Sequence, residues 1–226
     1  MSVKAVALFG SRARGNAEPR SDVDILLVTS ERRTRHVAMG NVSIYLYPWS
    51  HLLRRAAAGD LFVCHIVKEA KCLYDPERRV AALHAAFRFK ASYAREIGHA
   101  SDLGWYIALH HQRMHSAIVT KRIAWCVRTI LIARAAEQKK ALFSASALAQ
   151  FSGCPNVIDL IAQKDEPAAS PGTLEAFSAF LERFATGNPV PGGDPARFGA
   201  VFRARRNRVA QQSLRASSAS VHYGTD

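Results

Sequence analysis

The stretch at residues 9–28 reads Phe-Gly-Ser-Arg-Ala-Arg-Gly-Asn-Ala-Glu-Pro-Arg-Ser-Asp-Val-Asp-Ile-Leu-Leu-Val. Its Gly10-Ser11 pair ends the apolar run at residues 3–9, and Asp22 and Asp24 open a second apolar run. Both runs predict buried strands. Because side chains alternate across a strand, the two aspartates should project from one face as a chelating pair. The stretch therefore predicts a site that holds a metal-bound triphosphate.

Each residue type in this stretch suits one task of phosphate chemistry. Mg²⁺ prefers hard oxygen ligands, so two aspartates on one strand face can bridge two ions, and Mn²⁺ is an alternative metal. Gly10 permits a tight turn close to phosphate, and Ser11 adds a hydroxyl at the expected start of a helix. Arg12 and Arg14 can bind phosphate oxygens, and Ser21 can brace the acidic pair.

Composition sets the broad class. The chain has 226 residues, of which 49% are hydrophobic, enough for one large or two small folded domains. Its 31 Lys and Arg against 18 Asp and Glu give a formal charge of +13. This charge should attract nucleoside triphosphates, nucleic acids or acidic proteins. Because the arginines are spread over the whole length, nucleic acid is the less favoured partner.

The cysteines and the hydropathy indicate a cytoplasmic protein. Four cysteines stand without CxxC spacing, and we interpret them as reduced core residues. No secretory leader and no apolar stretch long enough to cross a bilayer is present in the sequence, so we expect no membrane partner. The cysteines are Cys64, Cys72, Cys126 and Cys154.

The first third of the chain predicts a mixed α/β domain at residues 1–76. Strands are expected at 3–9, 22–28 and 41–47, the last from alternation of apolar and polar residues. Pro48 should open a helix that stops at Gly59, and Asp60 should cap a second helix through Ala70. A short extended piece then leads to the boundary at Asp75-Pro76.

The rest of the chain predicts helices. Alanine, leucine, isoleucine and arginine recur there in long segments without proline, which favours a helical bundle at residues 77–200. Prolines and glycines from 167 to 195 indicate loops. Residues 201–226 are interpreted as a basic, flexible tail, in which the run 202–208 either is a solvated helix or contacts nucleic acid or an acidic partner. The expected helices are 77–99, 101–116, 118–138, 144–151, 156–162 and 173–186.

The motif closely resembles the signature of the DNA polymerase beta-like nucleotidyltransferase superfamily, especially its minimal nucleotidyltransferases. The resemblance lies in Gly10-Ser11, ten intervening residues, and Asp22-Val23-Asp24 followed by Ile-Leu-Leu-Val. It implies an α+β fold with a small mixed sheet packed by helices. It also implies that an α-helical bundle follows, as in kanamycin-type nucleotidyltransferases. In such a protein Asp22 and Asp24 would bind two catalytic Mg²⁺ ions, while Gly10 and Ser11 would grip the β and γ phosphates.

One position departs from the family pattern. Members usually carry a third acidic residue on a later strand, whereas the strand at 41–47 offers Ser43 or Tyr45. Without that carboxylate the metal that activates the acceptor loses a ligand, and a general base must come from elsewhere. Candidate substitutes without a supporting motif are Glu69, Glu96 and Asp102.

The sequence thus predicts a metal-dependent, ATP-binding nucleotidyltransferase. It would move a nucleoside monophosphate, AMP from ATP, onto a hydroxyl of a small-molecule or protein acceptor and release pyrophosphate. The bundle at 77–200 would bind the acceptor. The alternative is a degenerate nucleotide-binding or interaction module that lacks turnover together with the third carboxylate.

Overall fold

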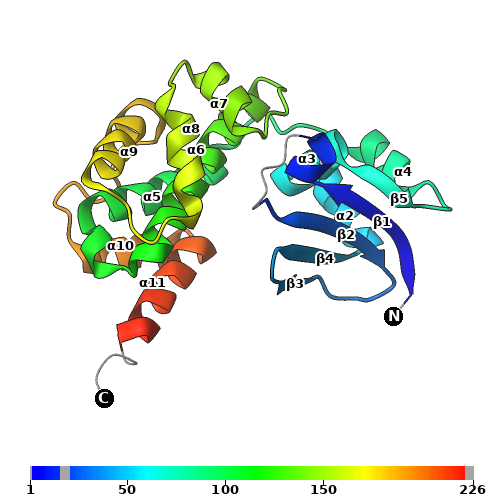
Figure 1. Cartoon of the computed structure of the whole chain (residues 1–226), viewed down its shortest axis with the longest axis horizontal. Coiled ribbons are helices and arrows are strands. Elements are labelled where there is room, and N and C mark those ends of the chain that lie inside the picture. Colours follow the sequence, from blue (N-terminus) through cyan, green and yellow to red (C-terminus); the bar gives the residue numbers. More distant parts are fainter. Residues whose placement is uncertain (1, 16–20, 222–226) are drawn as a thin grey trace. The chain divides into compact units, whose positions relative to one another are not determined.

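The structure is a computed structural model that describes residues 2–15 and 21–221. Residues 16–20 of the motif and residues 222–226 of the predicted tail lie outside this description. The chain divides into a first unit, Met1–Ala91 with Lys139–Ala141, and a second unit, Ser92–Gln138 with Leu142–Asp226. Each unit is described by itself below (Figure 1).

The first unit contains a five-stranded sheet in the order β3-β4-β2-β1-β5. Strands β2 and β4 run parallel, and the other neighbouring pairs are antiparallel. The mixed sheet followed by helices confirms the predicted α+β class. The strands are β1 Val3–Phe9, β2 Val23–Thr29, β3 Arg35–Met39, β4 Val42–Pro48 and β5 Lys71–Tyr74.

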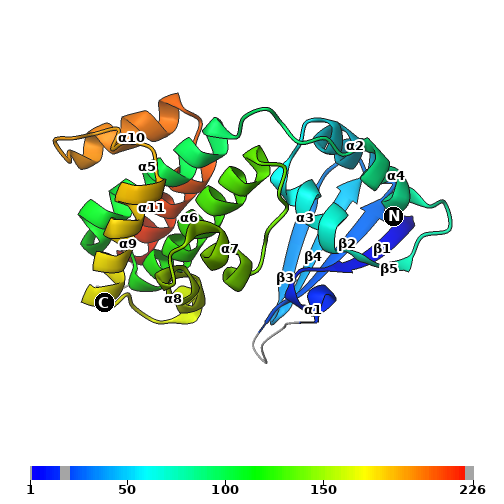
Figure 2. The same cartoon turned by 90° about the horizontal axis from the view of Figure 1, so that it is seen from above.

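One face of this sheet forms the core of the first unit. The short helix α1 Ser11–Arg14 follows β1, while α2 Trp49–Ala57, α3 Leu61–Glu69 and α4 Arg79–Ala86 contribute buried side chains to this core. Figure 2 shows α2, α3 and α4 on the same side of the strands. The strand residues buried on this face are Ala5, Ala7, Phe9, Leu26, Val28 and Tyr47.

The predicted helix signals at Pro48 and Asp60 are confirmed. Helix α2 begins directly after Pro48. The Asp60 carboxylate accepts hydrogen bonds from the backbone N–H groups of Phe62 and Val63, which caps α3. Asp60 also receives two hydrogen bonds from Arg55, so the cap and the end of α2 are joined.

Strand β3 was not predicted. Its residues are mostly exposed at the edge of the sheet, so they lack the apolar alternation that marks a half-buried strand. A two-residue Gly40-Asn41 turn joins β3 to β4, with Met39 paired to Val42. Gly40 has φ 58°, the left-handed conformation that such tight hairpins require. The Gly-Asn pair was the available signal for this hairpin.

The predicted helix at 77–99 is wrong, and the first unit extends past the predicted boundary at residue 76. Helix α4 ends before Phe87, and residues 87–93 are not helical. The Arg88 N–H donates to the Ala56 carbonyl at 3.2 Å, which holds this segment against α2. Because Leu83 of α4 is buried in the core of the sheet, α4 belongs to the first unit.

The second unit is a bundle around α6. This helix contacts α5, α7, α8 and α9, and its buried side chains include Ile123, Val127 and Ile130. Helix α5 runs through residues 98–101, where a break between two helices was expected. The helices are α5 Ala94–His110, η1 His111–Arg113, α6 Ser116–Glu137, α7 Ala145–Ser152, α8 Asn156–Ala162, η2 Gln163–Asp165, α9 Pro171–Phe184, α10 Pro195–Ala204 and α11 Arg208–Val221.

The predicted flexible tail at 201–226 differs from the structure. Helix α10 begins at Pro195, which occupies the first turn behind the Asp194 cap, so proline here starts a helix instead of marking a loop. Phe198, Phe202 and Ala210 are buried in the core of the second unit. Residues 195–217 are therefore packed helices.

The cysteine prediction holds in part. Cys64 and Cys126 are buried thiols, and burial raises the pKa of Cys64 to about 12. Cys72, by contrast, is exposed on the edge strand β5, and Cys154 is half-buried. All four are free thiols. Within residues 2–15 and 21–221, the helices are too short or too polar to cross a membrane.

Candidate functional site

Gly10 places the end of β1 directly against the carboxylate of Asp24. Phe9, the last residue of β1, pairs with Asp24 on β2, so Gly10 follows at the point where the chain turns away from the strand. Its φ of 79° and ψ of −160° belong to a region that is essentially restricted to glycine. A Cβ atom at Gly10 would lie 2.6 Å from Asp24 Oδ2. The turn therefore depends on the missing side chain, and it leaves backbone in contact with the carboxylate.

The charges of Asp22 and Asp24 both raise the pKa of Tyr45. Asp22 precedes β2 and is exposed, whereas Asp24 is half-buried on the strand. Burial raises the pKa of Tyr45, the charge of Asp24 raises it further, a hydrogen bond with Ser43 lowers it, and the charge of Asp22 raises it again. Both carboxylates therefore lie within electrostatic range of one phenol.

Arg12 holds the backbone immediately before Asp22. Its Nε and Nη2 donate to the Ser21 carbonyl at 3.1 and 2.9 Å. Helix α1 and the start of β2 are thereby joined on either side of residues 16–20. The predicted role of Arg12 was phosphate contact, and the structure shows a positioning contact that the sequence did not indicate.

Arg14 is engaged by a carboxylate of α3. Its Nη1 pairs with Glu69 Oε2 at 2.5 Å, and His65 Nε2 donates to the same oxygen at 2.6 Å. The Glu69 side chain is only 6% exposed. The His65 ring packs edge-on against Phe9, with ring centroids 5.4 Å apart. This network ties α1 to α3, so Arg14 and Glu69, proposed separately as a phosphate ligand and a base, neutralise each other.

Ser43 occupies the position across from Asp24. The two residues are direct partners in the parallel pairing of β2 and β4, and parallel partners point to the same face. The departure from the family pattern is therefore located at Ser43, with Tyr45 two residues further along β4. In the described part of the chain, no cluster of three or more His, Cys, Asp or Glu side chains is arranged to hold a metal.

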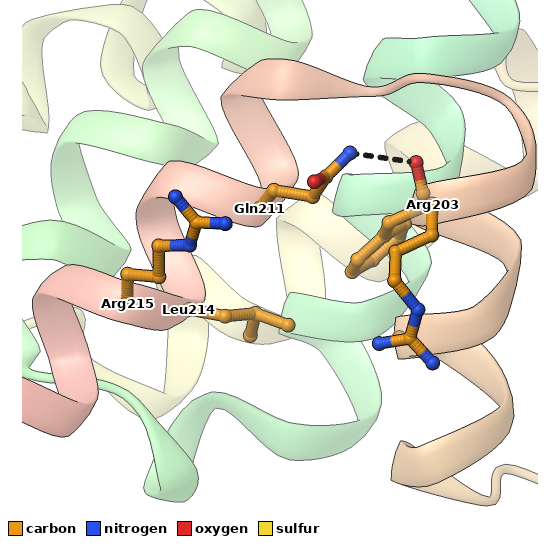
Figure 3. Close-up of a pocket in the computed structure, with 6 residues that line it drawn as sticks. Arg203, Gln211, Leu214 and Arg215 are labelled. Atoms are coloured by element: carbon orange, nitrogen blue, oxygen red, sulfur yellow. Dashed lines mark hydrogen bonds between the residues drawn. The ribbon is translucent and has the colours of Figure 1, made fainter.

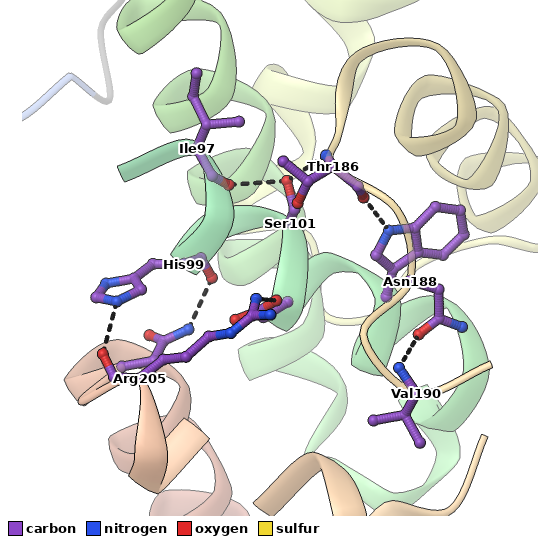
Figure 4. Close-up of polar contacts among 10 residues, drawn as sticks. Ile97, His99, Ser101, Thr186, Asn188, Val190 and Arg205 are labelled. Atoms are coloured by element: carbon purple, nitrogen blue, oxygen red, sulfur yellow. Dashed lines mark hydrogen bonds and ion pairs between the residues drawn. The ribbon is translucent and has the colours of Figure 1, made fainter. Parts of the chain in front are cut away.

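The other two candidate bases, Glu96 and Asp102, lie on α5 in the second unit. The Asp102 side chain is fully buried, and its Oδ1 accepts a hydrogen bond from Arg205 at 2.7 Å. Burial raises the Asp102 pKa, while Arg205 and His99 lower it. The surrounding contacts join α5 to the turn between α10 and α11, because His99 donates to the Arg205 carbonyl at 3.0 Å (Figure 4). Asp102 thus has a structural role.

The sequence did not indicate the ring contacts that surround Tyr45 beside the acidic pair. Tyr45 packs against Phe9 and Phe62, and His36 of β3 stacks on the Tyr45 ring with centroids 4.5 Å apart. The prediction treated Tyr45 only as a replacement for an acid. His65 was also missed, although its spacing of four residues from Glu69 on a helix was a readable signal.

A family model matches the first unit. Residues 1–91 match the family described as nucleotidyltransferase domain. The match ends at Ala91, where the main segment of the first unit ends. Among solved structures, the chain is similar to a nucleotidyltransferase-like protein from Exiguobacterium sibiricum 255-15, with 13% identity and a TM-score of 0.32 over 80% of this chain and 69% of that chain. No curated protein sequence matches the chain.

Proposed function

We propose, given that residues 1–91 are a nucleotidyltransferase domain, that the protein transfers a nucleoside monophosphate to an acceptor hydroxyl. The donor is proposed to be ATP, so AMP is transferred and pyrophosphate is released. The observation that carries the proposal is the contact between the Gly10 turn and Asp24, beside a second carboxylate, Asp22. A glycine turn, which lets backbone approach phosphate, and two hard anionic oxygen donors then meet at one place.

The donor set suits Mg²⁺ or Mn²⁺. Asp22 and Asp24 supply carboxylate oxygens, and the Gly10 backbone lies directly against Asp24 Oδ2. Mg²⁺ is commonly bound by one or two carboxylates, with substrate phosphates and water as the remaining ligands. The two aspartates would hold the metal, and when bound it would neutralise charge on the triphosphate. Without a cation, two unit charges ~4 Å apart repel by roughly 4 kcal/mol at an effective dielectric of ~20.

The remaining residues of the site bind and orient the substrate. Gly10 and Ser11 are proposed to seat the β and γ phosphates by backbone approach and by the Ser11 hydroxyl. Arg12 positions Asp22 through the Ser21 carbonyl. Arg14 is paired with Glu69, which offsets its charge, so a direct contact of Arg14 with phosphate would have to compete with that ion pair.

The reaction exchanges one P–O bond for another. The acceptor oxygen forms a bond to the α-phosphorus, the bond from that phosphorus to the α–β bridging oxygen breaks, and the pyrophosphate leaves with that oxygen. The hydroxyl proton passes to solvent, because no base is assigned at this site. Catalysis would then rest on positioning and charge neutralisation, which dominate phosphoryl-group chemistry in general. The acceptor is proposed to be a neutral small molecule or a protein side chain, since a charge of +13 disfavours a polycation.

A second candidate function is favoured by Ser43. Its place across from Asp24 removes the third carboxylate, which would leave a nucleotide-binding module without turnover. The two candidates differ in transfer, not in binding. A binding module would still require the Gly10 turn and the acidic pair.

Radiolabelled nucleotides distinguish the two. The protein is incubated with Mg²⁺ or Mn²⁺ and each nucleoside triphosphate, labelled at the α-phosphate to follow self-labelling. A parallel reaction with the label at the γ-phosphate follows pyrophosphate release. Transfer or pyrophosphate release that disappears in Asp22→Asn and persists in Asp165→Asn, an exposed aspartate of the second unit, supports the enzyme. Nucleotide binding that needs Asp22 but yields neither product supports the module.

A further inference from the structure

The last two helices carry a charge pattern that the proposed function does not use. Residues 195–221 contain six arginines, no lysine, and no aspartate or glutamate. Arg205 is paired with Asp102, but Arg203, Arg208 and Arg215 are exposed and form no salt bridge within the described chain. The six are Arg197, Arg203, Arg205, Arg206, Arg208 and Arg215.

Helix α11 has a buried face of small residues and an exposed face of long polar residues. Ala210, Ser213 and Ser217 are buried against the second unit. Arg208, Gln212 and Arg215 recur at four and three residues and are exposed, so they share the opposite face. We name the surface formed by Arg203, Arg208, Gln212 and Arg215 the basic face.

A groove of about 160 Å³ between α10 and α11 adjoins this face. The side chains of Arg203 and Arg215 lie on its two sides, with Leu214 between them (Figure 3). The remaining lining is Gly199, Phe202 and Gln211. The groove therefore presents a mostly apolar floor between two guanidinium groups.

The helix pair is held rigidly in place. Asn207 Nδ2 donates to the His99 carbonyl at 2.8 Å, and its backbone N–H donates to the Phe202 carbonyl at 2.9 Å. Gln211 Nε2 donates to the same Phe202 carbonyl at 3.0 Å. Together with the ion pair between exposed Arg205 and buried Asp102, these bonds fix the turn between the helices. A surface that is ordered before binding loses less conformational entropy on binding.

We propose that the basic face binds the sugar–phosphate backbone of single-stranded nucleic acid. A guanidinium group can donate two parallel hydrogen bonds to phosphate oxygens. Arginine is the only cationic residue type in residues 195–221. A sugar on the apolar floor between Arg203 and Arg215 would match the alternation of phosphate and sugar along a strand. The Gln212 amide adds a donor and an acceptor for sugar or base edges. An acidic peptide would pair with the arginines but would not place a sugar on the apolar floor between them.

The test is the affinity of a fluorescein-labelled oligouridylate for the full chain, measured by anisotropy over a range of salt concentrations. The test variant is Arg203→Gln with Arg215→Gln. The control variant is Arg32→Gln with Arg33→Gln, which removes the same charge from exposed positions of the first unit. We expect the test variant to bind about 10-fold more weakly near ~0.1 M salt and the slope of log K against log[salt] to fall by about 1.4, for two lost phosphate contacts on a single strand. The control should match the wild type.

Three outcomes overturn the proposal. These are no binding by the wild type, an equal loss in both double variants, and competition by polyglutamate that equals competition by unlabelled oligouridylate at the same charge concentration. The last result would assign the face to an acidic protein. A matched thermal melt checks folding, and Arg208→Gln provides a second variant should the double substitution unfold the chain. Asp22→Asn should bind oligouridylate normally, so failure of this proposal and failure of the proposed function are distinguishable.

Discussion

Gly10 and Asp24 are so close that a side chain at residue 10 would force the Asp24 carboxylate to move. The missing Cβ of Gly10 would stand 2.6 Å from Asp24 Oδ2, a distance that real Cβ atoms do not tolerate. The backbone of Gly10 also lies at φ 79° and ψ −160°, which side chains other than hydrogen disfavour. Two independent constraints therefore select glycine at the point where β1 meets the acidic pair.

Gly10→Ala should accordingly damage both stability and the site. The backbone constraint alone should lower the free energy of unfolding by about 1–3 kcal/mol, and displacement of Asp24 should weaken binding of Mn²⁺ and ATP. Urea denaturation measures the first effect and calorimetric titration the second. The control is Gly98→Ala inside α5, where nothing lies within 4 Å of the added Cβ, so stability should rise by about 0.5–1 kcal/mol. Equal behaviour of the two variants would contradict the special role of Gly10.

The sequence predicted the parts of the fold that local pattern determines. The apolar runs predicted as strands are strands, Val3–Phe9 and Val23–Thr29, and both contribute buried side chains to the core. Strand β3 was missed because an exposed edge strand needs no apolar alternation. Helix α10 was missed because Pro195 was interpreted as part of a loop, although Asp194 caps a helix that begins there.

The contacts that join distant segments could not be predicted. The Glu69 carboxylate meets Arg14 across 55 positions of sequence, and no local pattern encodes that pairing. Likewise, Arg12 was expected to bind phosphate because its charge suits that task, whereas the fold brings the Ser21 carbonyl within its reach. Residue type therefore did not indicate which partners these side chains contact.

Arg12→Lys should loosen the segment before Asp22. Lysine retains the charge but cannot donate two bonds to one carbonyl from a planar group, as Arg12 does to Ser21. We expect a loss of about 1–2 kcal/mol in the free energy of unfolding. Nucleotide transfer should fall about 10- to 100-fold because the acidic pair is misplaced.

Arg134→Lys provides the matched control for that variant. Arg134 donates from Nε and Nη2 to the Phe184 carbonyl at 2.8 and 2.6 Å, the same arrangement in the second unit. Its replacement should cost similar stability and leave nucleotide transfer unchanged. If the two lysine variants transfer nucleotide equally fast, Arg12 has no positioning role.

Asp102 should make the stability of the second unit depend on pH. Its pKa in the folded chain is raised above the ordinary 3.8, mainly by burial. At pH values between 3.8 and the folded pKa, the folded state therefore binds more protons than the unfolded state. Its contribution to stability is therefore full below about 3.8 and is lost as pH rises through the folded pKa. Each unit by which the folded pKa is raised corresponds to about 1.4 kcal/mol.

The measurement is the difference in unfolding free energy between the wild type and Asp102→Asn across acidic pH. We expect the wild type to lose stability relative to the variant as pH rises from 3.8, and the difference to level off above the folded pKa. Asp165→Asn removes an exposed aspartate next to Lys164 and should show no such trend. A difference that is constant with pH would show that Asp102 does not titrate differently in the folded chain.

Ser43→Asp should strengthen metal binding because it places a third carboxylate across from Asp24 on the same face of the sheet. Without metal, the added charge should lower the melting temperature, since like charges ~4 Å apart repel by up to roughly 4 kcal/mol at an effective dielectric of ~20. Mn²⁺ should remove that repulsion, so the shift in melting temperature on adding Mn²⁺ should be larger in Ser43→Asp than in the wild type. Ser50→Asp adds the same charge at an exposed position of α2 and should leave the Mn²⁺ shift unchanged. If Ser43→Asp stays less stable than the wild type at saturating Mn²⁺, the metal is not bound between Asp24 and residue 43.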